Sequence, residues 1–86
     1  MASPISNLEV YPNPSKGIFN IEFASQDKNI IVEIVNLLGK VILEKEIYAK
    51  DGKFENSFDI SNQSNGIYLL KIKHSNGMET LKLNKQ

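Results

Sequence analysis

The 86-residue sequence contains no cysteine, no tryptophan and no arginine, and it has a single histidine. Without cysteine the chain can form neither a disulfide framework nor a thiolate zinc site, and it has no thiol nucleophile. Its ten basic residues are all lysines, and ten acidic residues balance them to a net charge of +0. Nucleic-acid sites and anionic membrane surfaces usually need a basic face, often with arginine. We therefore expect no nucleic acid as a partner.

Long apolar runs are also missing. No stretch approaches the roughly 20 residues that a membrane-spanning helix needs, so we expect no membrane insertion. The N-terminal residues Met1-Ala2-Ser3-Pro4 lack the charged and apolar regions of a signal peptide. We interpret residues 1–7 as a linker or an expression remnant, and the chain as a piece excised from a longer protein. Residues 8–86 suffice for one small domain, whose core must be well filled.

The sequence offers no pattern for catalysis, a cofactor or a metal site. The lone His74 precedes Ser75-Asn76-Gly77 and is predicted to be an exposed turn residue, without the positioned partners of a hydrolytic triad. Gly39-Lys40 is followed by valine and lacks the rest of a phosphate-binding loop. The carboxylates are scattered, mostly on predicted solvent faces: Glu44, Glu46, Asp51, Glu55 and Asp59. We therefore predict that the domain is not an enzyme.

Apolar residues alternate with polar ones in several short stretches, which is typical of half-buried strands. Strands are predicted at 8–11, 18–23, 54–60, 67–73 and 78–84, and turn-forming residues separate them. The alternation assigns inward-facing side chains to Phe19, Ile21, Phe23, Phe54, Phe58, Ile60, Tyr68, Leu70, Ile72, Leu81 and Leu83. Lys82 and Lys85 are expected to point to solvent.

Residues 30–47 also fit the apolar stripe of an amphipathic helix. Eight of these eighteen residues are isoleucine or valine, which favour strands, and Gly39 would cost about 1 kcal/mol in a helix interior. We therefore predict a hairpin of strands 30–36 and 40–48 joined at Asn36–Gly39, with Val32, Ile34, Val41 and Leu43 facing the core. The fold class is then all-β, a seven-stranded antiparallel Ig-like β-sandwich.

The three tyrosines are far apart in sequence, which does not favour a sugar-binding platform. We interpret Tyr11 and Tyr68 as core or corner residues with hydroxyls bonded to backbone, and Tyr48 as exposed. Prolines and glycines mark four boxes in or beside turns. They are Tyr11-Pro12-Asn13-Pro14 with Gly17, then Gly39-Lys40, then Gly66-Ile67-Tyr68, and finally Lys82-Leu83-Asn84-Lys85-Gln86.

Taken in this order, the boxes resemble the type A C-terminal sorting domains of the type IX (Por) secretion system of Bacteroidetes. That family opens with a Tyr-Pro-Asn-Pro box and a glycine, and its middle box is a strand, an Asn or Asp, and Gly-Lys. A later box reads Ile-Ser, a polar loop and Gly-Ile-Tyr, matched here from Ile60-Ser61 to Tyr68, and the end is lysine-rich. The match runs from about residue 8 to 86, with Asn84 standing where the family often has an apolar residue.

The resemblance implies a function that composition does not. Such domains direct a larger N-terminal cargo from the periplasm through the outer-membrane type IX translocon to the cell surface or the medium. A sortase-like protease usually removes them. The recognition residues would be those of the boxes: Tyr11, Pro12, Asn13, Pro14, Gly17, Gly39, Lys40, Gly66, Tyr68, Lys82, Leu83 and Lys85. An Ig-like carbohydrate-binding or adhesion module and a spacer between domains remain as alternatives.

Overall fold

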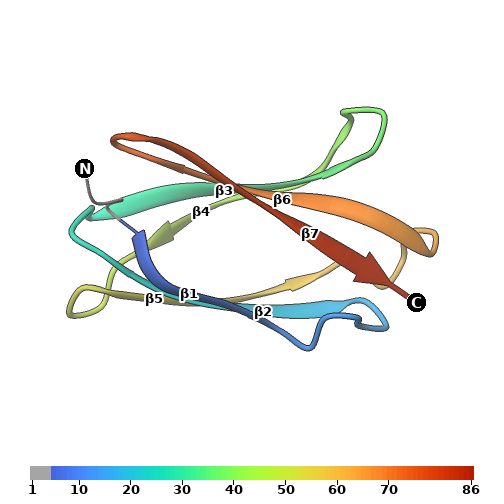
Figure 1. The fold of residues 1–86 in the computed structure, drawn as a ribbon, viewed down its shortest axis with the longest axis horizontal. Coiled ribbons are helices and arrows are strands. Elements are labelled where there is room, and N and C mark those ends of the chain that lie inside the picture. The colour runs from blue at the N-terminus through green and yellow to red at the C-terminus, as the bar shows by residue number, and fades with distance from the viewer. Residues whose placement is uncertain (1–4) are drawn as a thin grey trace.

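The computed structural model describes residues 5–86, which form seven strands in two antiparallel sheets (Figure 1). The strands are β1 (Ile5–Tyr11), β2 (Ile18–Ser25), β3 (Asn29–Asn36), β4 (Val41–Tyr48), β5 (Lys53–Asp59), β6 (Gly66–His74) and β7 (Gly77–Lys85). One sheet has the order β1-β2-β5 and the other the order β4-β3-β6-β7. The predicted all-β, seven-stranded antiparallel sandwich is confirmed.

The first strand begins earlier than the sequence predicts. Residues 5–7, which the sequence pattern places in a linker, belong to β1, where Ile5 pairs with Ser25 of β2. The side chain of Ile5 is buried in the core cluster, which explains why the strand extends to it. Asn7 has a positive φ of 57° where the pairing register shifts, so a bulge interrupts the expected alternation. Residues 1–4 of the predicted linker lie outside the described residues.

The ambiguous segment forms the predicted hairpin and not a helix. β3 and β4 pair from Asn29↔Tyr48 to Val35↔Val41. The register shifts between Ile34 and Val35, because one extra residue of β4 is inserted there. Val41 is consequently turned outward and exposed, so its predicted core position is wrong, whereas Leu43 lies opposite Ile34 and packs against the core as predicted.

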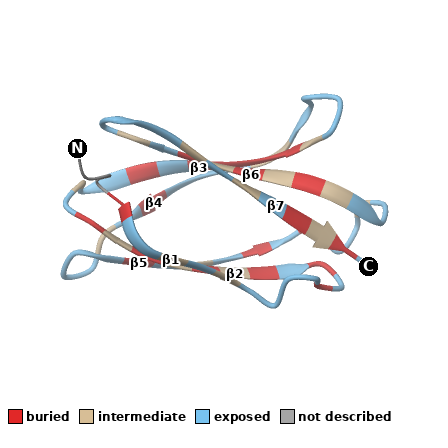
Figure 2. Cartoon of the chain, viewed as in Figure 1, coloured by how far each residue is buried: buried red, intermediate tan, exposed pale blue. Residues whose placement is uncertain are grey.

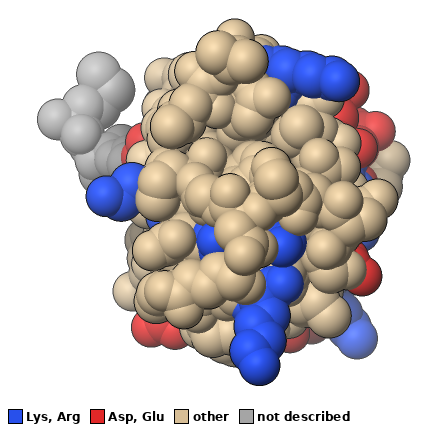
Figure 3. Space-filling model, turned by 90° about the vertical axis from the view of Figure 1, so that its right-hand side faces the viewer, with Lys and Arg blue, Asp and Glu red and all other residues tan. Residues whose placement is uncertain are grey.

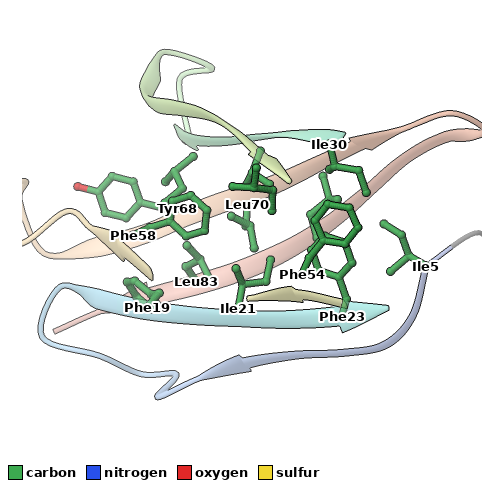
Figure 4. Packing of buried hydrophobic residues seen from close by; sticks show 14 of the residues in the cluster. Ile5, Phe19, Ile21, Phe23, Ile30, Phe54, Phe58, Tyr68, Leu70 and Leu83 are labelled. Atoms are coloured by element: carbon green, nitrogen blue, oxygen red, sulfur yellow. The ribbon is translucent and has the colours of Figure 1, made fainter. Parts of the chain in front are cut away.

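The core lies between the two sheets, where buried positions alternate along the strands (Figure 2). Its largest fully buried side chains include three phenylalanines, Phe19, Phe54 and Phe58. Phe23 and Phe54 stack across β2 and β5 with ring centroids 4.8 Å apart. Figure 4 shows Leu70 and Leu83 of the other sheet pointing into the same core. Leu83 is fully buried as predicted, and Leu81 packs against the cluster while only partly buried.

The last strand contributes to this core through Leu83, and we expect Leu83→Ala to lower the free energy of unfolding by about 2–5 kcal/mol. Met78→Ala in the same strand is the matched control, because Met78 is exposed and its loss should change stability by no more than about 0.5 kcal/mol. Urea denaturation followed by circular dichroism measures both. Equal destabilisation by the two changes would contradict the assignment of Leu83 to the core.

Candidate functional site

The four sequence boxes lie at the same end of the sandwich. Tyr68 of β6 is opposite both Asn36 of β3 and Leu83 of β7. The first box joins them because Ser15 forms a parallel bridge with Lys85. We call segments 11–17, 36–40, 60–66 and 82–86 the motif end. It is the right-hand end in Figure 1, and it faces the viewer in Figure 3.

Asn13 fastens the first box to the last strand. Its side-chain Nδ2 donates to the carbonyl of Lys82, and its Oδ1 accepts from the amide of Asn84, each at 2.9 Å. The side-chain amide thus pairs with β7 as a neighbouring peptide group would. These bonds join residues about 70 positions apart in the sequence. Asn13, which stands between the two prolines of the box, therefore links the first box to β7.

Ser15 extends the same attachment through its backbone. Its N–H donates to the carbonyl of Asn84 at 2.9 Å, and its carbonyl accepts from the amide of Gln86 at 2.8 Å. Its hydroxyl donates to the Ile18 carbonyl and accepts from the Gly17 amide, which fixes the turn into β2. Sequence reasoning did not single out Ser15. The signal was a serine two residues before a glycine, a spacing that suits a hydroxyl–backbone turn.

Gly17 allows the first box to approach the loop after β5. Its carbonyl accepts from the Ile60 amide at 2.8 Å, and its φ is +147°. A Cβ atom at this position would lie 2.5 Å from Cα of Ser61. Only glycine fits, for both conformational and steric reasons. The opposing Ser61 is itself held by the carboxylate of Asp59, which accepts from its amide at 2.9 Å and from its hydroxyl at 2.6 Å.

The second box is a tight turn organised by Asn36. Its Oδ1 accepts from the amides of Leu38 and Lys40, both at 2.9 Å. Its backbone carbonyl accepts from the amide of Gly39, which has a φ of +88°. The Asn-x-x-Gly-Lys pattern therefore encodes a closed turn with an exposed lysine. The predicted turn at 36–39 is confirmed.

The third box ends in a tyrosine corner. Tyr68 is buried, and its hydroxyl donates to the carbonyl of Ser64 at 2.6 Å, as predicted. Gly66, with a φ of +146°, begins β6 opposite Lys85 of β7. The polar loop is thus tied to the strand that follows it, and its position relative to β7 is set.

The two lysines of the last box differ. Lys82 is exposed as predicted, but Lys85 is only 6% exposed, so its predicted solvent position is wrong. Alternation places Lys85 on the same face as Leu83, and its Nζ donates to Oδ1 of Asn65 at 2.9 Å. The amine therefore serves as a polar tie to the third box, while its methylene stem covers apolar surface.

Two other sequence predictions fail. Tyr11 is 44% exposed, and its phenol lies against the carboxylate of Glu22 instead of a backbone carbonyl. Desolvation and then the hydrogen bond with Glu22 raise the pKa of Tyr11. His74 is half-buried, and its Nδ1 accepts from the amide of Asn76. Alternation along the strands does not predict the surroundings of either side chain.

The carboxylates singled out above and two of the three tyrosines are exposed on the surface of the described residues. The exposure of the carboxylates is as predicted. Within residues 5–86, no group of three or more His, Asp and Glu side chains is placed to hold a metal ion. Tyr11 and Tyr48, the exposed tyrosines, belong to different sheets and do not form one platform. In the same range no helix could cross a bilayer.

Charge is unevenly placed on the motif end. Figure 3 shows lysine side chains emerging from a largely uncharged face, with acidic groups near its margin. The exposed lysines of its segments are Lys16, Lys40 and Lys82. None of the segment residues is acidic, and Asp59, the last residue of β5, lies just outside the segment 60–66. The motif end is therefore a positively charged surface built on a rigid hydrogen-bonded frame.

The chain is similar to known proteins over nearly all of its length. Residues 9–86 match the family described as the secretion system C-terminal sorting domain. The chain is also similar to beta-agarase D of Zobellia galactanivorans, with 34% identity over 79 residues. That alignment covers 92% of this chain but 14% of the relative, so the chain spans a small part of that protein's length.

The close contact at Gly17 can be tested against Gly66, because the two glycines have nearly the same positive φ. No atom lies within 4 Å of a Cβ at Gly66. We expect Gly66→Ala to cost about 1–3 kcal/mol of stability from backbone strain alone. Gly17→Ala adds a steric clash with Ser61 and should cost about 1–3 kcal/mol more. Equal losses in urea denaturation would contradict the proposed packing.

The bonds from Ser61 to Asp59 predict a pH dependence. The hydroxyl and then the amide of Ser61 lower the pKa of Asp59 below its ordinary value of 3.8. A depressed folded-state pKa stabilises the fold above the unfolded value, and that contribution is lost as the pH falls through the folded pKa. Asp59→Ala should therefore destabilise the protein at pH 7, and the difference from wild type should shrink below about pH 3.8. In a Ser61→Ala background the pH-dependent part should be smaller. A difference that stays constant from pH 7 to pH 2 would refute this account.

Proposed function

The chain belongs to the family of type IX secretion-system C-terminal sorting domains, and on that premise we propose that it is the export signal of a larger cargo protein. Members of this family are non-catalytic, so any enzymatic activity would belong to the cargo. The similarity to the agarase, of which this chain matches 14%, supports a cargo much larger than the domain. The cargo would precede the domain in the full-length protein.

The observation that carries this proposal is the convergence of all four boxes at the motif end. A signal read as an unfolded peptide would not need boxes that meet only after folding. Here Asn13 and Ser15 contact β7, Gly17 contacts the loop after β5, and Lys85 contacts that loop at Asn65. We infer that the translocon recognises the folded end, and that recognition depends on all four segments together.

The proposed route has four stages. The cargo reaches the periplasm, the motif end is bound by the outer-membrane type IX translocon, and the cargo emerges at the cell surface or in the medium. A sortase-like protease then removes the domain. The recognition residues remain those that the sequence boxes predict, with Gly17, Gly39, Gly66, Tyr68 and Leu83 shaping the surface. The exposed Lys40 and Lys82 belong to its face.

We expect a periplasmic reporter carrying this 86-residue chain at its C-terminus to be exported by a Bacteroidetes host that has a type IX system. The same reporter without the chain should stay in the periplasm, and a host without the translocon should retain the fusion. Immunoblots of medium, surface and periplasmic fractions measure the distribution. Export that is unchanged when the chain is removed would refute the sorting role. Exported reporter that keeps the whole domain would refute the cleavage stage.

A further inference from the structure

The turn between β3 and β4 exposes two large aliphatic side chains. Leu37 is 67% exposed and Leu38 is 94% exposed. Among the connections between strands that the structure describes, no other turn exposes a large hydrophobic side chain. The connections at the opposite end carry polar and charged residues, including Gln26-Asp27-Lys28 and Ser75-Asn76. Among the turns of the described residues, the exposure of large aliphatic side chains is therefore particular to the turn between β3 and β4.

The turn holds these leucines in a fixed arrangement. Four hydrogen bonds of Asn36 close the loop. Its Oδ1 accepts two of them, its carbonyl accepts from the Gly39 amide, and its own amide donates to the Lys40 carbonyl at 3.0 Å. A surface fixed before binding loses less conformational entropy when a partner binds. Exposed leucines on a rigid turn are thus suited to recognition, because little ordering remains to oppose it.

The apolar surface continues from the turn onto the outer face of the four-stranded sheet. Val35 of β3 lies on that face, since its neighbour Ile34 points into the core, yet it is only 3% exposed. Val41 of β4 and Leu69 of β6 are its cross-strand partners and flank it. We call Val35, Leu37, Leu38, Val41 and Leu69 the apolar strip.

Lysines border the strip on the side of the motif end. Lys82 of β7 is the register partner of Leu69, and Lys40 directly follows the turn; both are exposed. The next row of the same face, farther from the turn, carries Glu44, Glu33 and Lys71. A complementary partner surface would therefore be apolar at its centre and acidic where it meets Lys40 and Lys82.

Resting on the proposed sorting function, we propose that the apolar strip is the surface by which a protein receptor of the translocon docks, through an apolar groove with an acidic rim. A second copy of this chain is a poorer occupant, because a two-fold interface would place the same lysines against each other. A lipid surface is also a poorer one, because lipid-binding clusters usually carry about four to eight basic residues. The strip is also not confined to the tip of the turn, because Val35, Val41 and Leu69 lie on the sheet itself.

The test is export of the reporter fusion with Leu37→Ser and Leu38→Ser combined. Tyr48→Ser with Met78→Ser is the matched control, because it removes two exposed apolar side chains, 68% and 49% exposed, from the opposite end. We expect the leucine variant to lower export at least tenfold and the control to leave it unchanged. Both purified domains should melt near the wild-type temperature, since all four side chains are exposed.

A charge-reversed variant, Lys40→Glu with Lys82→Glu, should also lower export, while Lys40→Arg with Lys82→Arg should retain it because the charges remain. A photo-crosslinking amino acid at position 38 should form an adduct with an outer-membrane component of the type IX system, and one at position 48 should not. Loss of export after charge reversal together with this adduct supports docking through the strip.

Three results would overturn the inference. Wild-type export of a stable leucine variant would remove the strip from recognition while leaving the sorting function in place. Leucine-dependent co-sedimentation with phosphatidylglycerol vesicles would assign the strip to lipid. Leucine-dependent dimers in sedimentation velocity would assign it to a second copy. Failure of the wild-type fusion to be exported would instead refute the sorting function itself.

Discussion

The hydrogen bonds between residues 13–15 and the end of β7 hold the two sheets together at the motif end. β1 and β2 belong to the three-stranded sheet and β7 to the other, so the connection between β1 and β2 crosses the sandwich to reach a strand edge. That edge would otherwise present unpaired backbone groups to solvent and to other chains. Where residues 13–15 bond to the end of this edge, Leu83 lies in the core, Lys85 donates to Asn65, and Gly17 packs against Ser61. The other boxes take their places around this junction.

Regular alternation made much of the fold predictable. Phe19, Ile21 and Phe23 face the core because a strand buries every second residue, and Tyr68, Leu70 and Ile72 follow the same rule. The turn at 36–39 was predictable from Gly39, which needs a positive φ, although the capping by the Asn36 side chain was not foreseen. The motif residues were identified through resemblance, and their meeting at one end depends on strand order, which a local pattern does not contain.

The failures have physical reasons that the sequence hides. One inserted residue in β4 turned Val41 outward, because a bulge reverses the alternation for the residues beyond it. Lys85 was assigned to the face opposite Leu83, although it follows Leu83 by two residues and so shares its buried face. An asparagine acceptor, Asn65, made burial of the amine possible. The start of β1 was missed because Ile5 stands among small and polar residues, and its partner on β2 is 20 residues away. The apolar strip was not predicted from the sequence. Val35 stands at an outward-facing position of β3, and it joins an apolar surface only because strand pairing places Val41 and Leu69 beside it.

The position of β7 as the final strand of the sandwich has a consequence for synthesis. A ribosome that stops or a gene that is truncated before β7 leaves a chain without Leu83 in the core and without a partner for Asn13 and Ser15. Such a chain has every earlier box in its sequence but cannot assemble the folded end. An export apparatus that reads this end would therefore select finished molecules and leave incomplete ones behind. The fold would then report on completeness as well as on destination.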